Sequence, residues 1–241
     1  MAADVRSSVV GRWRALGIAF DARPSGHDPD LERLLLDTAR ALPAMPRLLP
    51  MVATWLQRYG DAVARHRLRR LAVDELAPEG HPALGVLLES ADEGLHPARF
   101  PMVLKDLRPA AVPQPLFEVE SLTPSLRERA RRRASACSRR WGGWCEPVEF
   151  REDVLEPAQR VLRRHPWLRL AADFRGDLRA SVIAALRHDP EARDSEVGLA
   201  HAAGGSRAQV RNALANLELT GRATRTREPG VRRTRIAVGV A

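Results

Sequence analysis

The sequence predicts a mainly α-helical protein: a bundle of helices in the N-terminal part, and three helices followed by a short β-hairpin at the C-terminal end. Two observations support this prediction. Leu and Ala recur at helical spacing along most of the chain, and only one Tyr and five Phe are present. Hydrophobic residues make up 44% of the sequence, which is enough for a packed core, so we do not expect a disordered protein.

Residues 1–91 are predicted to form a bundle of four or five antiparallel helices with short connections. The first helix covers residues 5–20. Asp28 is expected to cap the second helix, because Pro29 after it suits the first helical position, and this helix extends to about residue 42. Pro50 is expected to interrupt the third helix. The later helices are predicted over residues 48–59, 61–76 and 81–91.

Residues 92–176 are predicted to be a proline-rich connector that packs on the bundle. Six prolines lie between residues 92 and 124, and this density favours loops over regular structure. Residues 167–174 lead into the next domain. Within the connector we expect a short strand at 116–119 and helices over 125–140 and 157–164.

The predicted helix over 125–140 is strongly basic, and Glu128 is its only acid. Because a helix turns every 3.6 residues or so, its arginines surround most of the helix, and several must face solvent or a partner. A second phosphate-binding surface and a solvated connecting helix explain the pattern equally well. The arginines are Arg127, Arg129, Arg131, Arg132, Arg133, Arg139 and Arg140.

Residues 177–241 are predicted to form a separate C-terminal domain. Two helices joined by a tight turn and followed by a basic hairpin are an arrangement by which a small domain presents one helix to the DNA major groove, with a loop beside it. The predicted elements are helices over 178–187, 195–202 and 206–220, a glycine-bearing turn at 203–205, and strands over 223–227 and 232–238.

The helix over 206–220 has two distinct faces. Ser206 and Gln209 fit a capping box, in which each side chain bonds the backbone N–H of the other residue. Val210, Leu214 and Leu217 follow helical spacing and are expected to face the core. The opposite face carries side chains that can read base edges, because Arg pairs with guanine and Asn or Gln with adenine. These side chains are Arg207, Gln209, Arg211, Asn212 and Asn216.

The predicted hairpin concentrates positive charge. Arg222, Arg225 and Arg227 on one strand face Arg232, Arg233 and Arg235 on the other, and these cations repel one another unless an anion such as phosphate lies nearby. From Ser206 to the end the chain holds eight Arg and two Glu, hence +6 of a total net charge of +9. The candidate DNA-binding residues are Ser206, Arg207, Gln209, Arg211, Asn212, Asn216, Arg225, Arg227, Arg232, Arg233 and Arg235.

The segment GSRAQVRNALANLELTGRATR resembles the recognition helix and first wing strand of bacterial winged helix-turn-helix transcriptional regulators of the MarR/ArsR kind. It has a Ser at the helix cap, alternating small and polar residues, a Leu-x-x-Leu pair and a Gly before the wing. The resemblance covers residues 177–241 and implies a DNA-binding role for Ser206, Arg207, Gln209, Arg211 and the wing arginines. It implies nothing about a ligand.

The overall charge indicates an anionic partner less strongly than its location does. Lys105 is the only lysine, and an excess of Arg and Ala also arises from GC-rich coding. Two Cys are too few for a disulfide framework or a structural zinc site. No secretory pattern is found over residues 1–20 and no apolar run could span a membrane, so we expect a cytoplasmic protein that does not bind membranes.

Two clusters outside the C-terminal domain have both a structural and a functional interpretation. Several aromatic residues form either a ligand pocket or core packing, and packing is the favoured interpretation: Trp141, Trp144, Phe150, Trp167 and Phe174. Cys137 and Cys145 lack a third ligand at metal spacing, so packing is also favoured there over a redox pair. Phosphate-binding loops and catalytic motifs are absent from the sequence, so no cofactor and no enzyme activity are expected.

The sequence therefore predicts a DNA-binding transcriptional regulator that uses its C-terminal domain on double-stranded DNA. The N-terminal part would dimerise, sense a ligand or hold a partner protein, and the leucine-rich helices between Leu31 and Leu88 offer the homodimer interface. One alternative is an antitoxin or adaptor whose C-terminal domain autoregulates or docks protein. Another, less favoured, is an enzyme with its site in the proline-rich middle.

Overall fold

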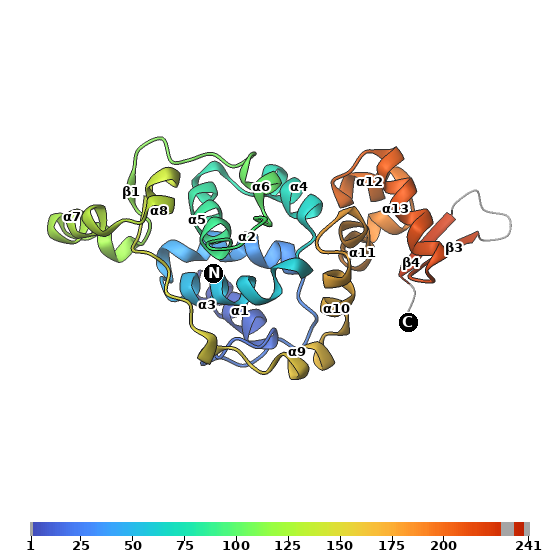
Figure 1. The fold of residues 1–241 in the computed structure, drawn as a ribbon, viewed down its shortest axis with the longest axis horizontal. Coiled ribbons are helices and arrows are strands. Elements are labelled where there is room, and N and C mark those ends of the chain that lie inside the picture. Colours follow the sequence, from blue (N-terminus) through green and yellow to red (C-terminus); the bar gives the residue numbers. More distant parts are fainter. Residues whose placement is uncertain (1, 228–233, 239–241) are drawn as a thin grey trace.

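The computed structural model describes residues 2–227 and 234–238, and most of these residues are helical. Side chains are described for residues 8–226 and 236–238. Figure 1 shows a central body built by the N-terminal helices. One helix, α7 (Pro124–Arg133), projects at one end of this body, and the last three helices with the β-hairpin lie at the other.

The central body is a bundle in which α3 packs against α5, and α2 lies against α4 and α5. Its helices are α1 (Ala2–Ala15), α2 (Leu31–Ala41), α3 (Leu48–Tyr59), α4 (Arg65–Glu75), α5 (His81–Ala91) and the short α6 (Pro101–Leu104). Two buried rings, Trp13 and Trp55, meet edge to face with centroids 5.2 Å apart. Their Nε1 atoms donate to Thr38 Oγ1 at 2.8 Å and to the Leu16 carbonyl at 3.0 Å, so both indoles are satisfied inside the core.

The cap of α2 differs from the prediction. Asp30, rather than Asp28, accepts the N–H of Arg33 at 3.3 Å and caps the helix. Asp28 lies before the helix, 2.8 Å from His165 Nδ1 and 3.0 Å from Arg187 Nη2. The carboxylate of Asp28, which local sequence rules assign to the helix cap, therefore binds two residues that are distant in the sequence.

Three other helix predictions in the body need correction. Pro50 is the third residue of α3 and does not interrupt it, because first-turn N–H groups have no acceptor within the helix. α1 ends at Ala15, and Gly17 follows with a left-handed φ of 90°. α4 begins at Arg65 instead of residue 61, because Gly60–Ala62 forms a 3-10 turn.

The middle of the chain holds a two-stranded parallel pair, β1 (Gln114–Pro115) with β2 (Gly143–Trp144). The strand predicted at 116–119 is wrong, since Glu118–Ser121 forms a 3-10 helix. The single helix predicted over 125–140 is also wrong: α7 ends at Arg133 and α8 (Ala136–Trp141) starts anew. The Ser135 hydroxyl caps α8 by accepting the Ser138 N–H at 3.0 Å. A new helix therefore starts at this residue, just after the end of α7.

The C-terminal part begins with α9 (Ala158–Arg164), as predicted. α10 (Pro166–Asp173) follows, where the sequence predicts only a connecting segment. Pro166 occupies the first helical position of α10, where its missing N–H costs nothing. The remaining elements follow the predicted order: α11 (Leu178–His188), α12 (Glu196–Ala203), α13 (Arg207–Leu219), β3 (Ala223–Arg227) and β4 (Thr234–Val238). The two strands are antiparallel, and residues 228–233 between them lie outside the described residues.

Buried apolar side chains fall into two clusters. The larger extends along the chain from Val9 to Ala171. The smaller contains Ala64 and side chains from Phe174 to Ile236, and we call residues 174–238 the C-terminal unit. Gly204 has a left-handed φ of 74°, and a Cβ there would clash with the His66 carbonyl of α4, so only glycine allows the two parts to approach at this turn.

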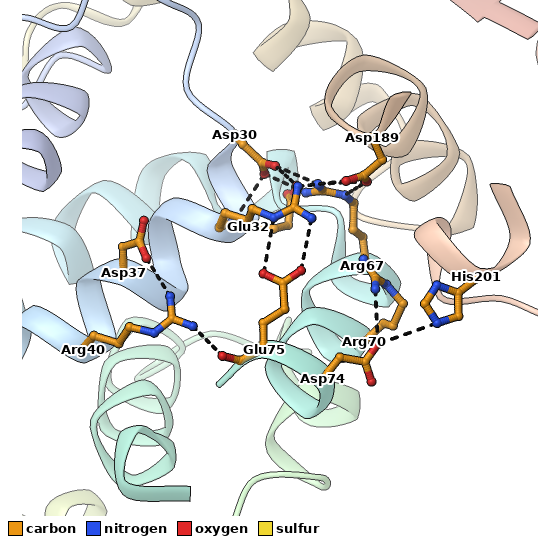
Figure 2. Close-up of polar contacts among 11 residues, drawn as sticks. Asp30, Glu32, Asp37, Arg40, Arg67, Arg70, Asp74, Glu75, Asp189 and His201 are labelled. Atoms are coloured by element: carbon orange, nitrogen blue, oxygen red, sulfur yellow. Dashed lines mark hydrogen bonds and ion pairs between the residues drawn. The ribbon is translucent and has the colours of Figure 1, made fainter. Parts of the chain in front are cut away.

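A buried ion-pair network also joins the two parts (Figure 2). Arg67 of α4 is fully buried and contacts both carboxylate oxygens of Asp30, at 2.6 and 2.7 Å, and Glu32 at 2.8 Å. Asp189, just after α11, accepts from Arg67 Nε at 3.1 Å and from Arg33 at 2.8 Å. A single buried guanidinium therefore ties α2 and α4 to the C-terminal unit.

The pKa values of two carboxylates in this network shift in opposite directions. Burial raises the pKa of Glu32 to about 7, and the charge of Asp30 adds to this rise, while the charge of Arg67 and the hydrogen bonds from Arg67 and Ala64 oppose it. The pKa of Asp30 is lowered to about 2: burial alone would raise it, but the hydrogen bonds and charge of Arg67 outweigh that effect. None of the helices in the described part of the chain is long and apolar enough to cross a bilayer.

Candidate nucleic-acid interface

α13 starts with the capping box that the sequence predicts. Ser206 Oγ accepts the Gln209 N–H at 3.3 Å, and Gln209 Oε1 accepts the Ser206 N–H at 3.0 Å. Both residues are exposed, but each already holds the start of the helix. Their predicted contacts to DNA would therefore use only the remaining hydroxyl proton and amide N–H groups.

The predicted apolar face of α13 is confirmed, and the predicted polar face is confirmed in part. Val210, Leu214 and Leu217 are at most 2% exposed and join the smaller apolar cluster, where α13 packs on α11. The opposite side is solvent-exposed. We define the outer face of α13 as the side formed by its exposed residues Arg207, Ala208, Arg211, Asn212, Ala215 and Leu219; the exposed Gln209 lies outside this side, at the edge nearer Asn216.

Small residues on the outer face allow close approach of another surface. Ala208 and Ala215 lie between longer polar side chains along the helix.

Arg207, unlike Arg211 and Arg225, has no ion-pair partner among the side chains that the structure describes. Its guanidinium is therefore available to bind an external anion. Arg207 and Asn212 thus lie where the sequence analysis expects base-reading groups.

Asn216 lies apart from the outer face, which corrects its predicted position. Its side chain is half-buried, and its Oδ1 accepts from Arg179 Nη1 of α11 at 3.2 Å. Arg179 is itself held by Asp177 at 2.6 Å and lies over the Phe174 ring at 4.6 Å. Asn216 therefore links α13 to α11 within the protein.

Glu196, which the sequence analysis did not single out, lies beside two of the predicted DNA-binding arginines. It is the first residue of α12 and contacts Arg211 at 3.5 Å and Arg225 at 2.8 Å. Glu218 contacts Arg225 at 2.6 Å. Exposed ion pairs of this kind contribute little to stability, so phosphate can replace them at small cost. No local pattern reveals this contact, because it depends on how α12 packs beside α13.

The hairpin is described only in part. Arg225 pairs with Ile236 across the strands and Arg227 with Thr234, while the buried Ile236 joins the smaller apolar cluster. Arg222 precedes β3 instead of lying on it: it stacks on Phe174 at 4.9 Å and contacts Asp173 at 3.5 Å. Other predicted wing side chains lie outside the described residues: Arg227, Arg232, Arg233 and Arg235.

The arginines predicted to surround a single helix over 125–140 are distributed over α7 and α8. Arg131 pairs with Glu128 at 2.9 Å, and Arg133 with Glu146 at 3.0 Å. Arg139 folds back on α7, where its Nη2 donates to the carbonyls of Arg131 and Arg132 at 2.7 and 3.2 Å. Several of these arginines therefore contact carboxylates or helix-end carbonyl groups of the protein itself.

The predicted aromatic residues do not form one cluster: Trp141 and Trp167 belong to the larger apolar cluster and Phe174 to the smaller one, and packing explains these three residues and the two cysteines. Trp141 is buried against Gly85 of α5 and its Nε1 donates to Glu89 at 2.5 Å, while the buried Trp167 lies under the guanidinium of Arg187 at 5.2 Å. The two cysteines are free thiols, and burial raises the pKa of both to about 12. Thiols with such pKa values are poor nucleophiles and metal ligands, which argues against a redox pair.

The leucine-rich helices do not provide the predicted dimer interface. Leu31, Leu34, Leu35, Leu84 and Leu88 are at most 1% exposed within one chain. Their side chains fill the core of the body, because the leucine stripes of α2 and α5 face each other. A second chain has no access to them.

Comparison with known proteins gives no relative: no protein-family model, curated protein or solved structure matches this chain.

Proposed function

We propose that this protein is a DNA-binding transcriptional regulator and that residues 177–241 act as a winged helix-turn-helix. The observation that carries the proposal is the one-sided construction of α13. Its apolar residues are buried on α11, and its outer face presents Arg207, Arg211 and Asn212 beside a basic hairpin. Such an arrangement suits a helix that enters the major groove while a neighbouring loop contacts the backbone.

The proposed docking assigns different tasks to the two elements. The N-terminal half of α13, with Arg207 and Arg211, would reach base edges, where Arg pairs best with guanine. The hairpin would contact phosphates, which gives affinity that falls steeply with salt. Arg211 and Arg225 would exchange Glu196 for DNA on binding.

The larger N-terminal body would not carry out catalysis in this proposal. We expect it to bind a ligand, a partner protein or a second copy of the chain, in a cytoplasmic regulator without a cofactor. A homodimer would double the base-reading surface on a two-fold symmetric site. Light scattering of the purified protein, alone and with DNA, measures whether one or two chains bind.

A second candidate function rests on two apolar side chains near the same surface. Leu219 at the end of α13 is 86% exposed, and Val197 at the start of α12 is 50% exposed. Exposed apolar side chains mark a protein contact where they form part of a larger apolar patch. They are what an antitoxin or adaptor would use to dock a partner chain, which would then co-purify with the protein.

Fluorescence anisotropy tests the main proposal. Labelled duplexes of random sequence and of the region upstream of the protein's own gene are titrated at two salt concentrations. We expect tighter binding of the upstream duplex and a steep loss of affinity for both duplexes as salt increases. Absence of binding at low salt would contradict the proposal and favour the protein-docking alternative.

A further inference from the structure

A large cleft lies between the central body and the C-terminal unit. Its volume is about 1270 Å³. The body contributes the end of α1, residues 24–28 and side chains from 156 to 165, while the C-terminal unit contributes the end of α11, Arg193 and residues 236–238 of β4. The cleft is separate from the outer face of α13, and none of the candidate DNA-binding side chains that the structure describes lines it.

Positive charge exceeds negative charge in this cleft. Four arginines line it (Arg14, Arg164, Arg187 and Arg193) against two carboxylates, Asp28 and Glu156. Glu156 is shared by Arg14 at 2.8 Å and Arg164 at 3.0 Å, and Asp28 by Arg187 at 3.0 Å and His165 at 2.8 Å. Each carboxylate therefore serves two cationic or polar partners, and the walls keep a net positive charge.

Two of the arginines are held in fixed orientations. Arg187 lies on the Trp167 ring at 5.2 Å, and its Nε is buried without a hydrogen-bond acceptor among the described residues. Arg193 donates from Nε and Nη2 to the carbonyls of Leu186 and Arg187, at 2.8 and 3.0 Å. A guanidinium that is already positioned loses little freedom when it binds an anion, and its planar fork matches a phosphate or a carboxylate.

We propose that this cleft binds an organic anion that carries a phosphate or carboxylate group. The arginines would hold the anionic group, and Ala237 and Val238 of β4, which keep exposed surface, would contact the organic part. Such a division between a few polar groups and an apolar lining is typical of small-molecule sites.

A ligand in this cleft would regulate the protein, and this part of the inference rests on the proposed DNA-binding function. The ligand would touch the body on one side, and α11 and β4 on the other. α11 is the helix on which α13 packs, and β4 belongs to the hairpin. An anion that prefers one arrangement of the two parts would therefore change the affinity for DNA.

Isothermal titration calorimetry of the full chain tests the site without DNA. Pyrophosphate and citrate serve as probes for the phosphate and carboxylate classes, at constant ionic strength. Arg14→Gln and Arg187→Gln each remove one cleft guanidinium. Arg12→Gln is the matched control: Arg12 is on α1 like Arg14 and also contacts one carboxylate, Asp37, at 2.8 Å, but it does not line the cleft.

We expect saturable binding of at least one probe by the unmodified chain and by Arg12→Gln, and binding weaker by about tenfold or more in both cleft variants. No saturable binding of either probe, or an equal loss in Arg12→Gln, would overturn the proposal. Because Arg14→Gln and Arg187→Gln also break ion pairs, Ala237→Glu provides an independent variant: Ala237 is exposed on the cleft wall, and a carboxylate there repels an anion. Unchanged binding in Ala237→Glu would also overturn the proposed site.

The DNA titration repeated with saturating probe separates the two proposals. A changed DNA affinity in the unmodified chain, absent in Arg187→Gln, supports regulation through the cleft. Anion binding with unchanged DNA affinity overturns the regulatory coupling and leaves the site in place. Anion binding by a protein that does not bind DNA overturns the proposed function alone.

Discussion

The helices α7 and α13 lie at opposite ends of the molecule and differ in both charge and setting (Figure 1). α7 holds five Arg and one Glu, whereas α13 holds two Arg and one Glu. α13 buries three large apolar residues on α11 and presents its arginines on the other side. α7 buries only Ala130, and its arginines are distributed all around it. α13 is therefore fixed in orientation by its buried face, whereas α7 lacks an apolar face that would orient it.

Their anchoring differs as well. The unit that contains α13 is tied to the central body by Arg67, which contacts Asp30, Glu32 and Asp189 (Figure 2). α7 contacts the neighbouring 3-10 turn and the short strands β1 and β2, and its ion pairs are exposed. The number of arginines therefore does not distinguish these helices as DNA-binding candidates. The proposal for α13 rests instead on the arginines that a packed helix presents on one face.

The largest expected effect comes from the anchor of the C-terminal unit. Arg67→Met leaves the buried carboxylate of Glu32 without its guanidinium partner and removes one of the two arginines that hold Asp30 and Asp189, and should lower the free energy of unfolding by about 3–5 kcal/mol. Urea denaturation measures this change. Arg69→Met is the matched control on the same helix, because Arg69 is exposed and pairs only with Asp106, so its loss should cost about 1 kcal/mol or less. Similar losses in both variants would contradict the account of the anchor.

The same anchor should make stability depend on pH through Glu32. Its pKa is raised from 4.5 to about 7 by burial, so the folded state keeps a proton that the unfolded chain releases. The contribution of Glu32 to stability is therefore complete below about pH 4.5 and is lost as pH rises to about 7, by at most about 1.4 kcal/mol per pH unit.

Comparison with Glu32→Gln isolates this contribution. Burial lowers the pKa of His66 and His188, which gives the opposite trend, with stability lost as pH falls through about 6.5. Both histidines are present in both proteins. The difference in unfolding free energy between the unmodified chain and Glu32→Gln should therefore decrease from pH 5 to pH 7, and a constant difference would mean that Glu32 is ionised in the folded protein.

DNA binding should distinguish the two basic helices directly. Arg207→Ala on α13 should weaken binding to the preferred duplex by roughly 1–3 kcal/mol if this side chain reads a base. Arg132→Ala on α7 removes a comparably exposed arginine and should leave binding unchanged. Anisotropy titrations measure both, and an equal loss would show that general charge, and not the outer face of α13, governs binding.

The smallest expected effect is an increase in affinity. Glu196→Gln removes the acid beside Arg211 and Arg225 and should strengthen DNA binding by up to about 1 kcal/mol, because Arg211 is then free for phosphate and Arg225 loses one of its two carboxylate partners. Glu128→Gln removes the corresponding acid beside Arg131 on α7 and should have no effect on DNA affinity. Weaker binding by Glu196→Gln would mean that Glu196 positions the arginines for DNA.

The sequence predicted those features that depend on neighbouring residues. The capping box of Ser206 and Gln209 and the helical spacing of Val210, Leu214 and Leu217 are local, and both are present in the structure. Local rules also explain two predictions that were wrong. Ser135 caps a new helix, α8, so the predicted helix over 125–140 is two helices. Asp30 and Asp28 can both cap α2 by local rules, and the structure uses Asp30.

Contacts between distant segments were not predictable in this way. Glu196 reaches Arg211 because α12 packs beside α13, and Asp189 reaches Arg67 across the two parts of the molecule. The cleft between Arg14 and Arg187 likewise exists only because α1 and α11 are brought together by the fold. Spacing along the chain carries no information on any of these three features.

Photo-crosslinking to DNA tests most directly the claim that the outer face of α13 contacts the double helix. A photoreactive benzoylphenylalanine replaces Ala208 or Ala215, both exposed on that face, and replaces Arg132 of α7 as the control. After irradiation with a labelled upstream duplex, we expect crosslinks from positions 208 and 215 and none from position 132. Crosslinks from position 132 alone, or from none of the three in a sample that binds the duplex, would contradict the assignment of α13 as the DNA-binding helix.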